Sequence, residues 1–277
     1  MTKISFIIMA AVAAILASCG KDSAESAMET DSNEIRFEVG MLGTTKANEE
    51  AFETGDNISL YAVEYTTEDA PELMIGGNYL NNEKLSFDGT AWKGANTLYW
   101  SEKPCDFYAM YPYIKPTSVE SFVFEVATDQ NSAKSSKVRK EDGKVDLKFT
   151  HLMSKCVVNV VKGEKFEGEL PDDISVHIYN TTTTAILNIA GGSVEKYAFG
   201  DKKTITMKKL SNDKFAAVVV PQNLERRTPL IEITMGGIAY LLEYSLSFKP
   251  GYVHNINLVV NTSPDQEKIE ITIDPNM

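Results

Sequence analysis

The sequence has few of the residues that build metal sites, disulfide frameworks and nucleic-acid interfaces. Among its 277 residues there are three cysteines and three histidines, scattered along the chain. So sparse a set leaves little room for a disulfide framework or a zinc site. Basic residues are also outnumbered, because 27 Lys and Arg stand against 39 Asp and Glu, for a net charge of −12. Nucleic acids are bound through clustered Lys and Arg, so this balance argues against such a partner.

Long apolar runs and the common catalytic motifs are missing as well. No apolar run reaches the ~20 residues that a membrane-spanning helix needs. The sequence contains no G-x-S-x-G motif, no phosphate-binding loop, no H-E-x-x-H motif and no EF-hand loop. We therefore expect a protein that is not an enzyme and that uses no cofactor and no metal ion.

Alternation of apolar and polar residues is the strongest pattern after residue 20. It recurs over residues 35–39, 58–63, 122–126, 145–149 and 174–178. Such alternation, with turn residues between segments, is typical of half-buried strands. Gly236 and Gly237 predict a two-residue hairpin turn, and the apolar run 215–220 predicts a strand buried on both faces. No long segment has helical spacing, so we predict an all-β fold.

The length favours two β-sandwich domains over one. At ~100–200 residues per domain the chain has room for two, and 43% apolar residues are enough to build their cores. The longest stretch without a strand pattern is residues 128–144, which we interpret as a basic, polar loop. We place the boundary after it, with an N-terminal sandwich over residues 34–150 and a C-terminal sandwich over residues 151–277.

The first residues have the pattern of an export signal. Lys3 precedes an apolar stretch, residues 4–17, that is too short to span a membrane. Small residues then lead into Cys19, as in a bacterial lipobox, where the signal is removed before the cysteine and the thiol carries a lipid. We predict a lipoprotein signal peptide over residues 1–18 and a flexible, acidic tether over residues 19–33. A plain secretory signal with an incidental cysteine is the alternative.

Two features of the sequence leave alternatives open. The densest group of aromatic residues is either a stacking platform for sugar rings or a domain core with tyrosine hydroxyls at its rim. Its members are Trp92, Tyr99, Trp100, Phe107, Tyr108, Tyr111 and Tyr113. Cys105 and Cys156 are either paired in an oxidising compartment or separately buried, and geometry rather than sequence decides between these.

Five sets of residues together resemble the fimbrillin family, the type V pilin-like lipoproteins of anaerobic Gram-negative bacteria. They are residues 44–47 with 52–61, 98–100 with 106–113, 145–155, 220–222 and 248–252. Their order matches that of the family, and they extend over nearly the whole chain after the signal segment. The resemblance implies two tandem β-sandwich domains of transthyretin-like topology in an exported lipoprotein. Residues 131–140 differ from many relatives, which carry an apolar motif there.

The resemblance also implies assembly by strand exchange. In polymerising relatives a protease cuts after a basic residue that follows the first strand, and the C-terminal strand of a neighbouring subunit fills the vacated groove. Here the first strand is predicted over residues 34–39, and Lys46 stands where cleaved relatives often carry Arg. The candidate donor strand, residues 269–273, has Ile269, Ile271 and Ile273 on one face. An ordinary edge strand of the second domain is the alternative.

These features predict a surface-exposed lipoprotein of the cell outer membrane, held there by palmitate or a similar lipid. We expect a fimbrial subunit or accessory protein in cell adhesion and biofilm formation. Its expected partners are other fimbrial subunits and a host or bacterial surface receptor. If it is processed, we expect it in the fimbrium. The alternative is a monomeric surface lipoprotein that binds glycan or host protein through the aromatic group.

The lipid anchor can be tested at one residue. Cys19→Ser should leave the protein without lipid and release it from membranes, because that thiol is the predicted acylation site. Incorporation of labelled palmitate into the expressed protein measures this directly. Cys105→Ser, which leaves the lipobox intact, is the matched control. Labelling of the Cys19→Ser variant at the level of the control would contradict the lipobox interpretation.

Overall fold

Strands make up nearly all of the regular structure, as the alternating sequence pattern predicts. The computed structural model describes residues 33–42, 52–69, 71–126, 129–225, 228–262 and 271–274. Within these ranges the helical structure is limited to one 3₁₀ turn, Lys140–Asp142. No helix of the described residues has the length and apolar character needed to cross a membrane. The predicted all-β class is confirmed.

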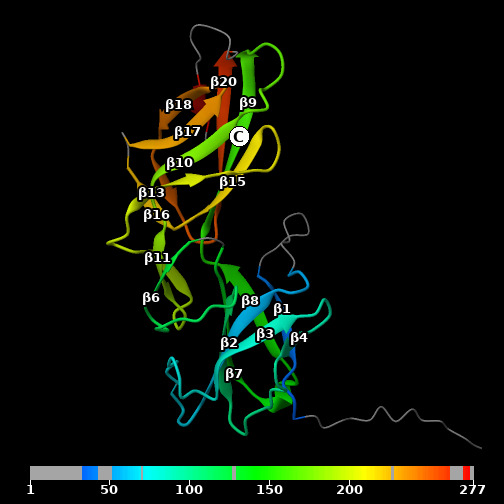
Figure 1. Cartoon of the computed structure of the whole chain (residues 1–277). Coiled ribbons are helices and arrows are strands. Elements are labelled where there is room, and N and C mark those ends of the chain that lie inside the picture. Colours follow the sequence, from blue (N-terminus) through cyan, green and yellow to red (C-terminus); the bar gives the residue numbers. More distant parts are fainter. Residues whose placement is uncertain are drawn as a thin grey trace, which may run out of the picture. The chain divides into compact units, whose positions relative to one another are not determined.

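The first half of the chain builds a seven-stranded sheet (Figure 1). In spatial order its strands are β1 Phe37–Met41, β8 Val145–His151, β7 Asn131–Val138, β5 Cys105–Tyr111, β2 Asn57–Glu64, β3 Leu80–Phe87 and β4 Trp92–Gly94. β1 begins later than the predicted first strand, and Glu34 instead forms an isolated bridge with Tyr99. The sheet therefore ends in β1 on one side and β4 on the other.

The interior strands β2 and β5 are buried on both faces. In β2, Ile58 and Leu60 contact one core, whereas Tyr61 and Val63 contact a second core on the opposite face. β5 divides in the same way, because Phe107 faces the first core and Tyr108 and Met110 face the second. Successive side chains of a strand point to opposite faces, so both strands need large apolar residues at consecutive positions.

Asp106 places a carboxylate within this buried strand. Its side chain is 1% exposed, yet both carboxylate oxygens have partners. The backbone N–H of Lys137 donates to Oδ1 at 2.9 Å, and Lys134 Nζ lies 3.3 Å from Oδ2. A buried charge without such partners would strongly destabilise the fold, so Asp106 fixes how β7 lies beside β5.

The strand β7 occupies the segment for which the sequence predicts a polar loop, and that prediction is wrong. Ala133 and Val138 are its apolar residues, so its side chains carry almost no strand pattern. Its backbone nevertheless pairs with β5 on one side and β8 on the other. Lys134 Nζ lies over the Tyr108 ring, 4.6 Å from the ring centroid. Ladder hydrogen bonds require a neighbouring backbone rather than apolar side chains, and this is why the pattern failed here.

The second half of the chain builds two larger sheets. The five-stranded sheet has the order β14 Lys208–Lys209, β15 Lys214–Val219, β9 Ser154–Lys165, β20 Val253–Thr262 and β21 Ile271–Asp274. The four-stranded sheet has the order β13 Lys202–Thr206, β10 Ser175–Thr182, β17 Pro229–Met235 and β18 Ile238–Glu243. A third core, rich in Val and Ile, draws its residues from both sheets. In Figure 1, β9 and β20 run side by side, as their parallel pairing requires.

The predicted hairpin turn is confirmed. Met235 pairs with Ile238 across Gly236 and Gly237, whose φ angles are 58° and 74°. Two consecutive positive φ angles match the twist of the flanking strands, and glycine adopts them without strain. The Asp173 carboxylate accepts both glycine N–H groups at 3.1 Å. The turn is therefore set by its own two residues and held by a third residue from another loop.

Two short sheets complete the described chain. One has the order β12 Ser193–Lys196, β11 Thr184–Asn188 and β6 Phe122–Glu125; the other pairs β16 Gln222–Leu224 with β19 Leu246–Phe248. β11 follows β10 almost without interruption, and yet it pairs with β6 from the first half. Ala185 and Leu187 of β11 join the same core as Tyr61 and Tyr108. The division into two sandwich domains, and their transthyretin-like topology, stay predictions.

Trp100 closes the first core. Its side chain is 7% exposed, and its ring meets that of Phe107 edge-on with centroids 6.3 Å apart. The Trp100 backbone N–H donates to the Asn33 carbonyl at 2.8 Å, which ties the start of the described chain to the same core. A large side chain so placed contributes both apolar burial and specific ring packing.

Trp100→Ala should therefore lower the free energy of unfolding by about 3–5 kcal/mol, as truncations of large core residues do. Its neighbour Tyr99 is 54% exposed, so Tyr99→Ala is a matched control with an expected change within about 0.5 kcal/mol. Urea denaturation followed by circular dichroism measures both. Equal effects of the two substitutions would contradict this description of the core.

Candidate functional site

The predicted site residues fall mostly outside the part of the chain that the structure describes. Cys19, Lys46 and Ile269 all lie outside the described residues. Ile271 and Ile273 belong to β21. The described residues include the sheet edges on which the predicted first strand and donor strand lie, and a groove that the sequence does not reveal.

β1 closes one edge of the seven-stranded sheet. Among the described strands it pairs with β8 alone, in parallel and over five residues. Phe37, Val39 and Met41 alternate along β1 and pack, half-buried, against the first core. Beyond them, the Leu42 N–H donates to the Phe149 carbonyl at 2.7 Å. Three alternate apolar side chains and one line of backbone hydrogen bonds thus hold β1 in place.

Glu38 adds charge pairs on the outer side of β1. Its carboxylate accepts a hydrogen bond from Lys144 Nζ and lies 3.7 Å from Lys148 Nζ. The hydrogen bond and charge of Lys144, followed by the charge of Lys148, lower the pKa of Glu38 below its usual value. The carboxylate is exposed, so salt screens these pairs and they contribute more to register than to strength.

β21 forms one edge of the five-stranded sheet. It pairs antiparallel with β20, so that Ile271 lies opposite Val260 and Ile273 opposite Leu258. The Ile271 side chain is half-buried against the core that these sheets share. In this structure the candidate donor strand is thus an edge strand of its own chain. A donor role requires β21 to leave β20, and it stays a prediction.

Most of the aromatic group lies in the cores. Trp92, Trp100, Phe107 and Tyr108 are each at most 9% exposed, whereas Tyr99 stands out at the surface. A stacking platform for sugars needs ring faces that open to solvent. Burial of these four rings favours the core interpretation and removes most of the platform on which the glycan-binding alternative depends.

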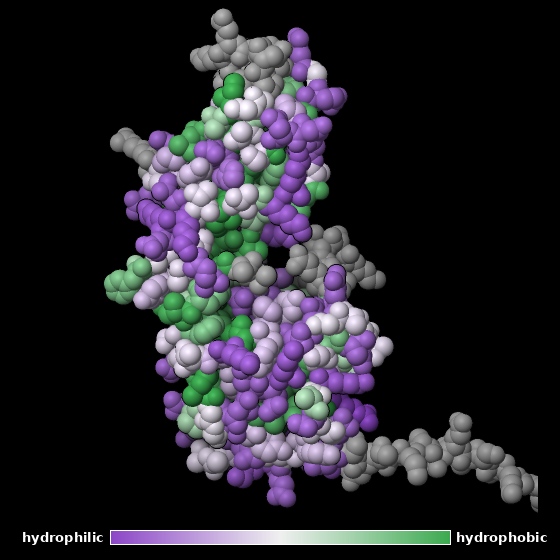
Figure 2. Space-filling view, in the orientation of Figure 1, coloured by the Kyte–Doolittle hydropathy of each residue, from purple (hydrophilic) through white to green (hydrophobic). Residues whose placement is uncertain are grey.

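A groove lies between β13 and β15. Its volume is about 440 Å³. Its apolar lining consists of Val126, Ile205, Leu210, Ala216, Ala217, Val218 and Val220. Figure 2 shows hydrophobic side chains, in green, between hydrophilic ones in the region where Figure 1 places β13 and β15. We call it the β13–β15 groove.

Residues 216–218 are half-buried because they line the β13–β15 groove. The prediction that the run 215–220 is buried on both faces is therefore wrong.

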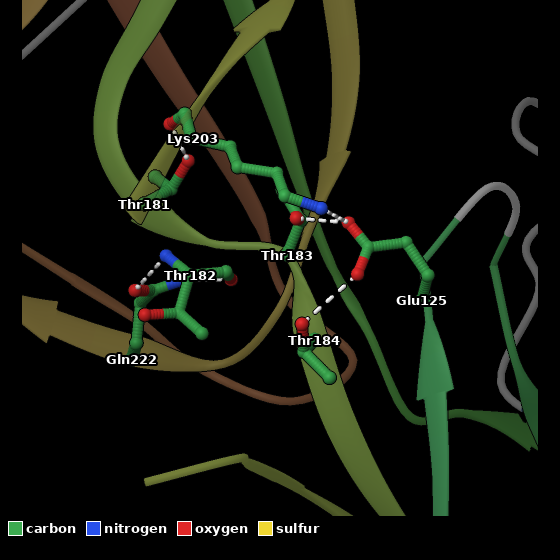
Figure 3. A network of polar contacts seen from close by, with 7 residues as sticks. All are labelled: Glu125, Thr181, Thr182, Thr183, Thr184, Lys203 and Gln222. Atoms are coloured by element: carbon green, nitrogen blue, oxygen red, sulfur yellow. Dashed lines mark hydrogen bonds and ion pairs between the residues drawn. The ribbon is translucent and has the colours of Figure 1, made fainter. Parts of the chain in front are cut away.

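Four consecutive threonines mark the point where the chain passes from one sheet to another beside this groove. The strand β10 ends at Thr182 and β11 begins at Thr184, so the ladder hydrogen bonds are interrupted here. The Gln222 side chain replaces them: its Oε1 accepts the Thr182 N–H and its Nε2 donates to the Thr182 carbonyl, both at 3.0 Å (Figure 3). Gln222 is buried, so these bonds satisfy polar groups that water does not reach.

We call this passage from β10 to β11 the crossing. Glu125 bonds to residues on its other side (Figure 3). Its carboxylate accepts hydrogen bonds from the Thr183 hydroxyl, from Thr184 Oγ1 at 2.9 Å and from Lys203 Nζ at 2.7 Å. The hydrogen bond from Lys203, followed by that from Thr183, lowers the pKa of Glu125 to about 2. One side chain of β6 therefore fastens both β11 and β13. Thr183 also lines the β13–β15 groove, so this network borders the groove.

The two described cysteines are free thiols in different cores. Cys105 lies in the first core and Cys156 in the core of the second half. Burial raises the pKa of Cys105 to about 11 and that of Cys156 to about 12. Both thiols are thus neutral and poorly reactive at physiological pH. The open question of their pairing is answered by geometry, as expected.

The histidines have separate local partners. His151 bonds to Asp129 through Nδ1, His177 lies 3.2 Å from Thr206 Oγ1, and His254 accepts the Lys249 N–H at 3.1 Å. Across the described ranges, no group of three or more His, Cys, Asp or Glu side chains could hold a metal ion.

The sequence matches one protein family over most of its length. Residues 45–275 match the profile of the family described as Fimbrillin-like. The chain belongs to the fimbrillin-like family. The resemblance drawn from the sequence is thereby confirmed. Among curated proteins, none matches the chain.

Solved structures support the fold of this fimbrillin-like chain. A Bacteroides uniformis protein, provisionally assigned to cell adhesion, has 22% identity and a TM-score of 0.68, with 87% of this chain and 98% of that chain covered. A Bacteroides ovatus protein with the same provisional assignment has 15% identity and a TM-score of 0.63, covering 88% and 97%. A Bacteroides ovatus fimbrial protein has 18% identity and a TM-score of 0.50, covering 84% and 51%. At such identities the likeness concerns the fold.

The Glu125 network should give a pH-dependent contribution to stability. Glu125→Gln keeps the shape of the side chain but removes the negative charge that pairs with Lys203. The Glu125 side chain is 49% exposed, so solvent screening limits the loss; we expect about 0.5–1 kcal/mol at pH 7. Because the folded-state pKa is lowered to about 2, this contribution is present above the unfolded-state pKa and is lost as the pH falls toward about 2.

Urea denaturation of both proteins between pH 7 and pH 2 measures this difference. Glu120→Gln, an exposed carboxylate that is not part of the network, is the matched control and should show no such trend. A stability difference for Glu125→Gln that stays constant down to pH 2 would refute the electrostatic explanation.

Proposed function

We propose that the chain is a surface-displayed fimbrial subunit or accessory lipoprotein that joins other subunits by β-strand exchange. Its place is the outer face of the cell outer membrane, to which lipid on Cys19 anchors it before assembly. Cell adhesion and biofilm formation are the processes it serves. Membership of the fimbrillin-like family and the fold shared with fimbrial and adhesion-assigned proteins support this proposal.

The observation that carries the proposal is that the predicted first strand and the predicted donor strand are both edge strands. β1 and β21 each have one strand neighbour among the described residues. An edge strand can leave by breaking one ladder of hydrogen bonds, whereas an interior strand must break two. The backbone N–H and C=O groups that it leaves unpaired on its neighbour can then bond to another strand, which is β-augmentation.

The spacing of side chains also matches between the two strands. β1 presents Phe37, Val39 and Met41 to the first core, and the candidate donor presents Ile269, Ile271 and Ile273 at the same two-residue interval. Burying each isoleucine contributes about 1.5–3 kcal/mol. A donor strand could therefore take over the apolar contacts of β1 once cleavage at Lys46 frees that strand.

Cleavage near Lys46 should convert a monomer into oligomers. A trypsin-like protease that cuts after Lys46 frees β1 to dissociate and so opens the β8 edge. Light scattering after size-exclusion chromatography measures the mass, and electron microscopy shows any filaments. Lys46→Gln should block conversion, and Lys46→Arg, which keeps the basic side chain, should preserve it. Cut protein that stays monomeric at high concentration would overturn assembly by this route.

The donor role is tested by deleting residues 268–277. The truncated chain should fold, be cut as before and remain monomeric, because no strand is left to exchange. Circular dichroism and urea denaturation establish whether it is folded. A truncated chain that unfolds would show that the last strand belongs to its own core, which contradicts the donor role.

A further inference from the structure

The β13–β15 groove follows two strand edges and extends over one face of β15 as far as Lys155 of β9. Ile205 and Thr206 are neighbours on β13, and Ala216 and Ala217 are neighbours on β15, yet all four line it. Successive side chains of a strand point to opposite faces, so a cavity over one face would touch only every second residue. A cavity that touches neighbours on both strands lies along their edges.

Each of these edges turns backbone groups toward the groove. On β15, Lys214 accepts the Leu210 N–H, and Ala216 pairs with Lys208 of β14. Alternate residues of a strand use the same edge, so Val218 turns its N–H and C=O the same way, beyond the end of β14. None of the described strands pairs with Val218 on that side.

The same reasoning applies to β13. Met207 donates its N–H to Val176 of β10 at 2.9 Å. By alternation its neighbour Thr206 directs its backbone groups to the opposite edge, where the groove lies. The groove is thus bordered by a donor and an acceptor on each side, which is the hydrogen-bonding capacity that an added strand requires.

The charge of the groove limits what can occupy it. Among the described residues, its charged lining residues are Lys155 and Lys208 and none of its lining residues is acidic, although the chain carries a net charge of −12. A complementary occupant is an extended peptide with aliphatic side chains on one face and acidic side chains on the other. Residues 269–274 have this pattern, because Ile269, Ile271 and Ile273 alternate with Glu270, Thr272 and Asp274.

We propose that the β13–β15 groove receives residues 269–274 of a second copy of the chain, and that it does so before any cleavage of the receiving copy. This inference rests on the donor role in the proposed function. It adds a second acceptor site for the donor strand, which is open in the uncleaved chain and separate from the β8 edge. The isoleucines enter the apolar lining, the acidic side chains face Lys208, and backbone bonds form to Thr206 and Val218. A full-length copy holds β21 on its own β20, so uncleaved chains stay largely monomeric while a free peptide binds.

Fluorescence anisotropy with a labelled peptide of residues 266–277 tests this. The receiving protein is the uncleaved chain carrying Cys19→Ser, so that it remains in solution. We expect saturable binding at 150 mM salt, weakened about tenfold by Lys208→Glu, which places like charges together. Lys209→Glu makes the same charge change one residue away, at a side chain outside the groove lining that bonds to Asp172 and Asn212, and should leave the affinity within about twofold.

A scrambled peptide without the alternation should not bind. Hydrogen exchange should slow at the Thr206 and Val218 amides when the native peptide is bound, since those N–H groups become paired. Thermal denaturation of both variants shows that they are folded.

Binding that Lys208→Glu leaves unchanged would place the peptide elsewhere, such as on β20, and would overturn the groove proposal. Binding only after cleavage at Lys46 would overturn it too, while supporting the proposed function. If the peptide binds neither the uncleaved nor the cleaved protein, both the groove proposal and the proposed strand exchange are overturned. Binding of dodecanoate but not of the peptide would make the groove a lipid site and would also overturn the proposal.

Discussion

Backbone pairing at strand edges is the constraint on which this structure depends. A chain built almost entirely of strands has to match each line of N–H and C=O groups with another line, with side chains or with water. Interior strands such as β2 and β5 satisfy this on both sides and supply the double-sided cores. The strands that end a sheet, among them β1 and β21, satisfy it on one side. The surfaces available for assembly are therefore the places where pairing stops.

Where pairing stops inside the fold, side chains replace it. Between β10 and β11 the amide of Gln222 bonds to the backbone of Thr182 in both directions. Glu125 then joins the neighbouring threonines to Lys203 of β13. These bonds allow one nearly continuous segment to serve two sheets, which a ladder alone would not permit. Thr183 of this network also lines the β13–β15 groove, so the network borders the groove.

Particular elements show how far the sequence pattern reaches. The glycine pair of the β17–β18 hairpin follows from local pattern, because turn chemistry acts over a few residues. The burial of Trp100 and Phe107 was open in the sequence and is decided by the tertiary structure. The strand β7 was missed because its pairing with β5 needs no apolar side chains. The run over residues 215–220 predicts a strand buried on both faces, since nothing in the run shows that β14 ends before Val218. The four threonines were the one sequence signal near the crossing.

By itself, the sequence determined the all-β class, the family and the pattern of the candidate strands, since alternation, turn residues and motif order are local properties of the chain. The tertiary structure decided which strands end a sheet, where Cys105 and Cys156 lie, and that a groove with two lysines opens between β13 and β15. Strand neighbours are contacts between distant residues, selected by how whole sheets pack. Sequence alternation specifies only that a strand exists and which of its faces is buried.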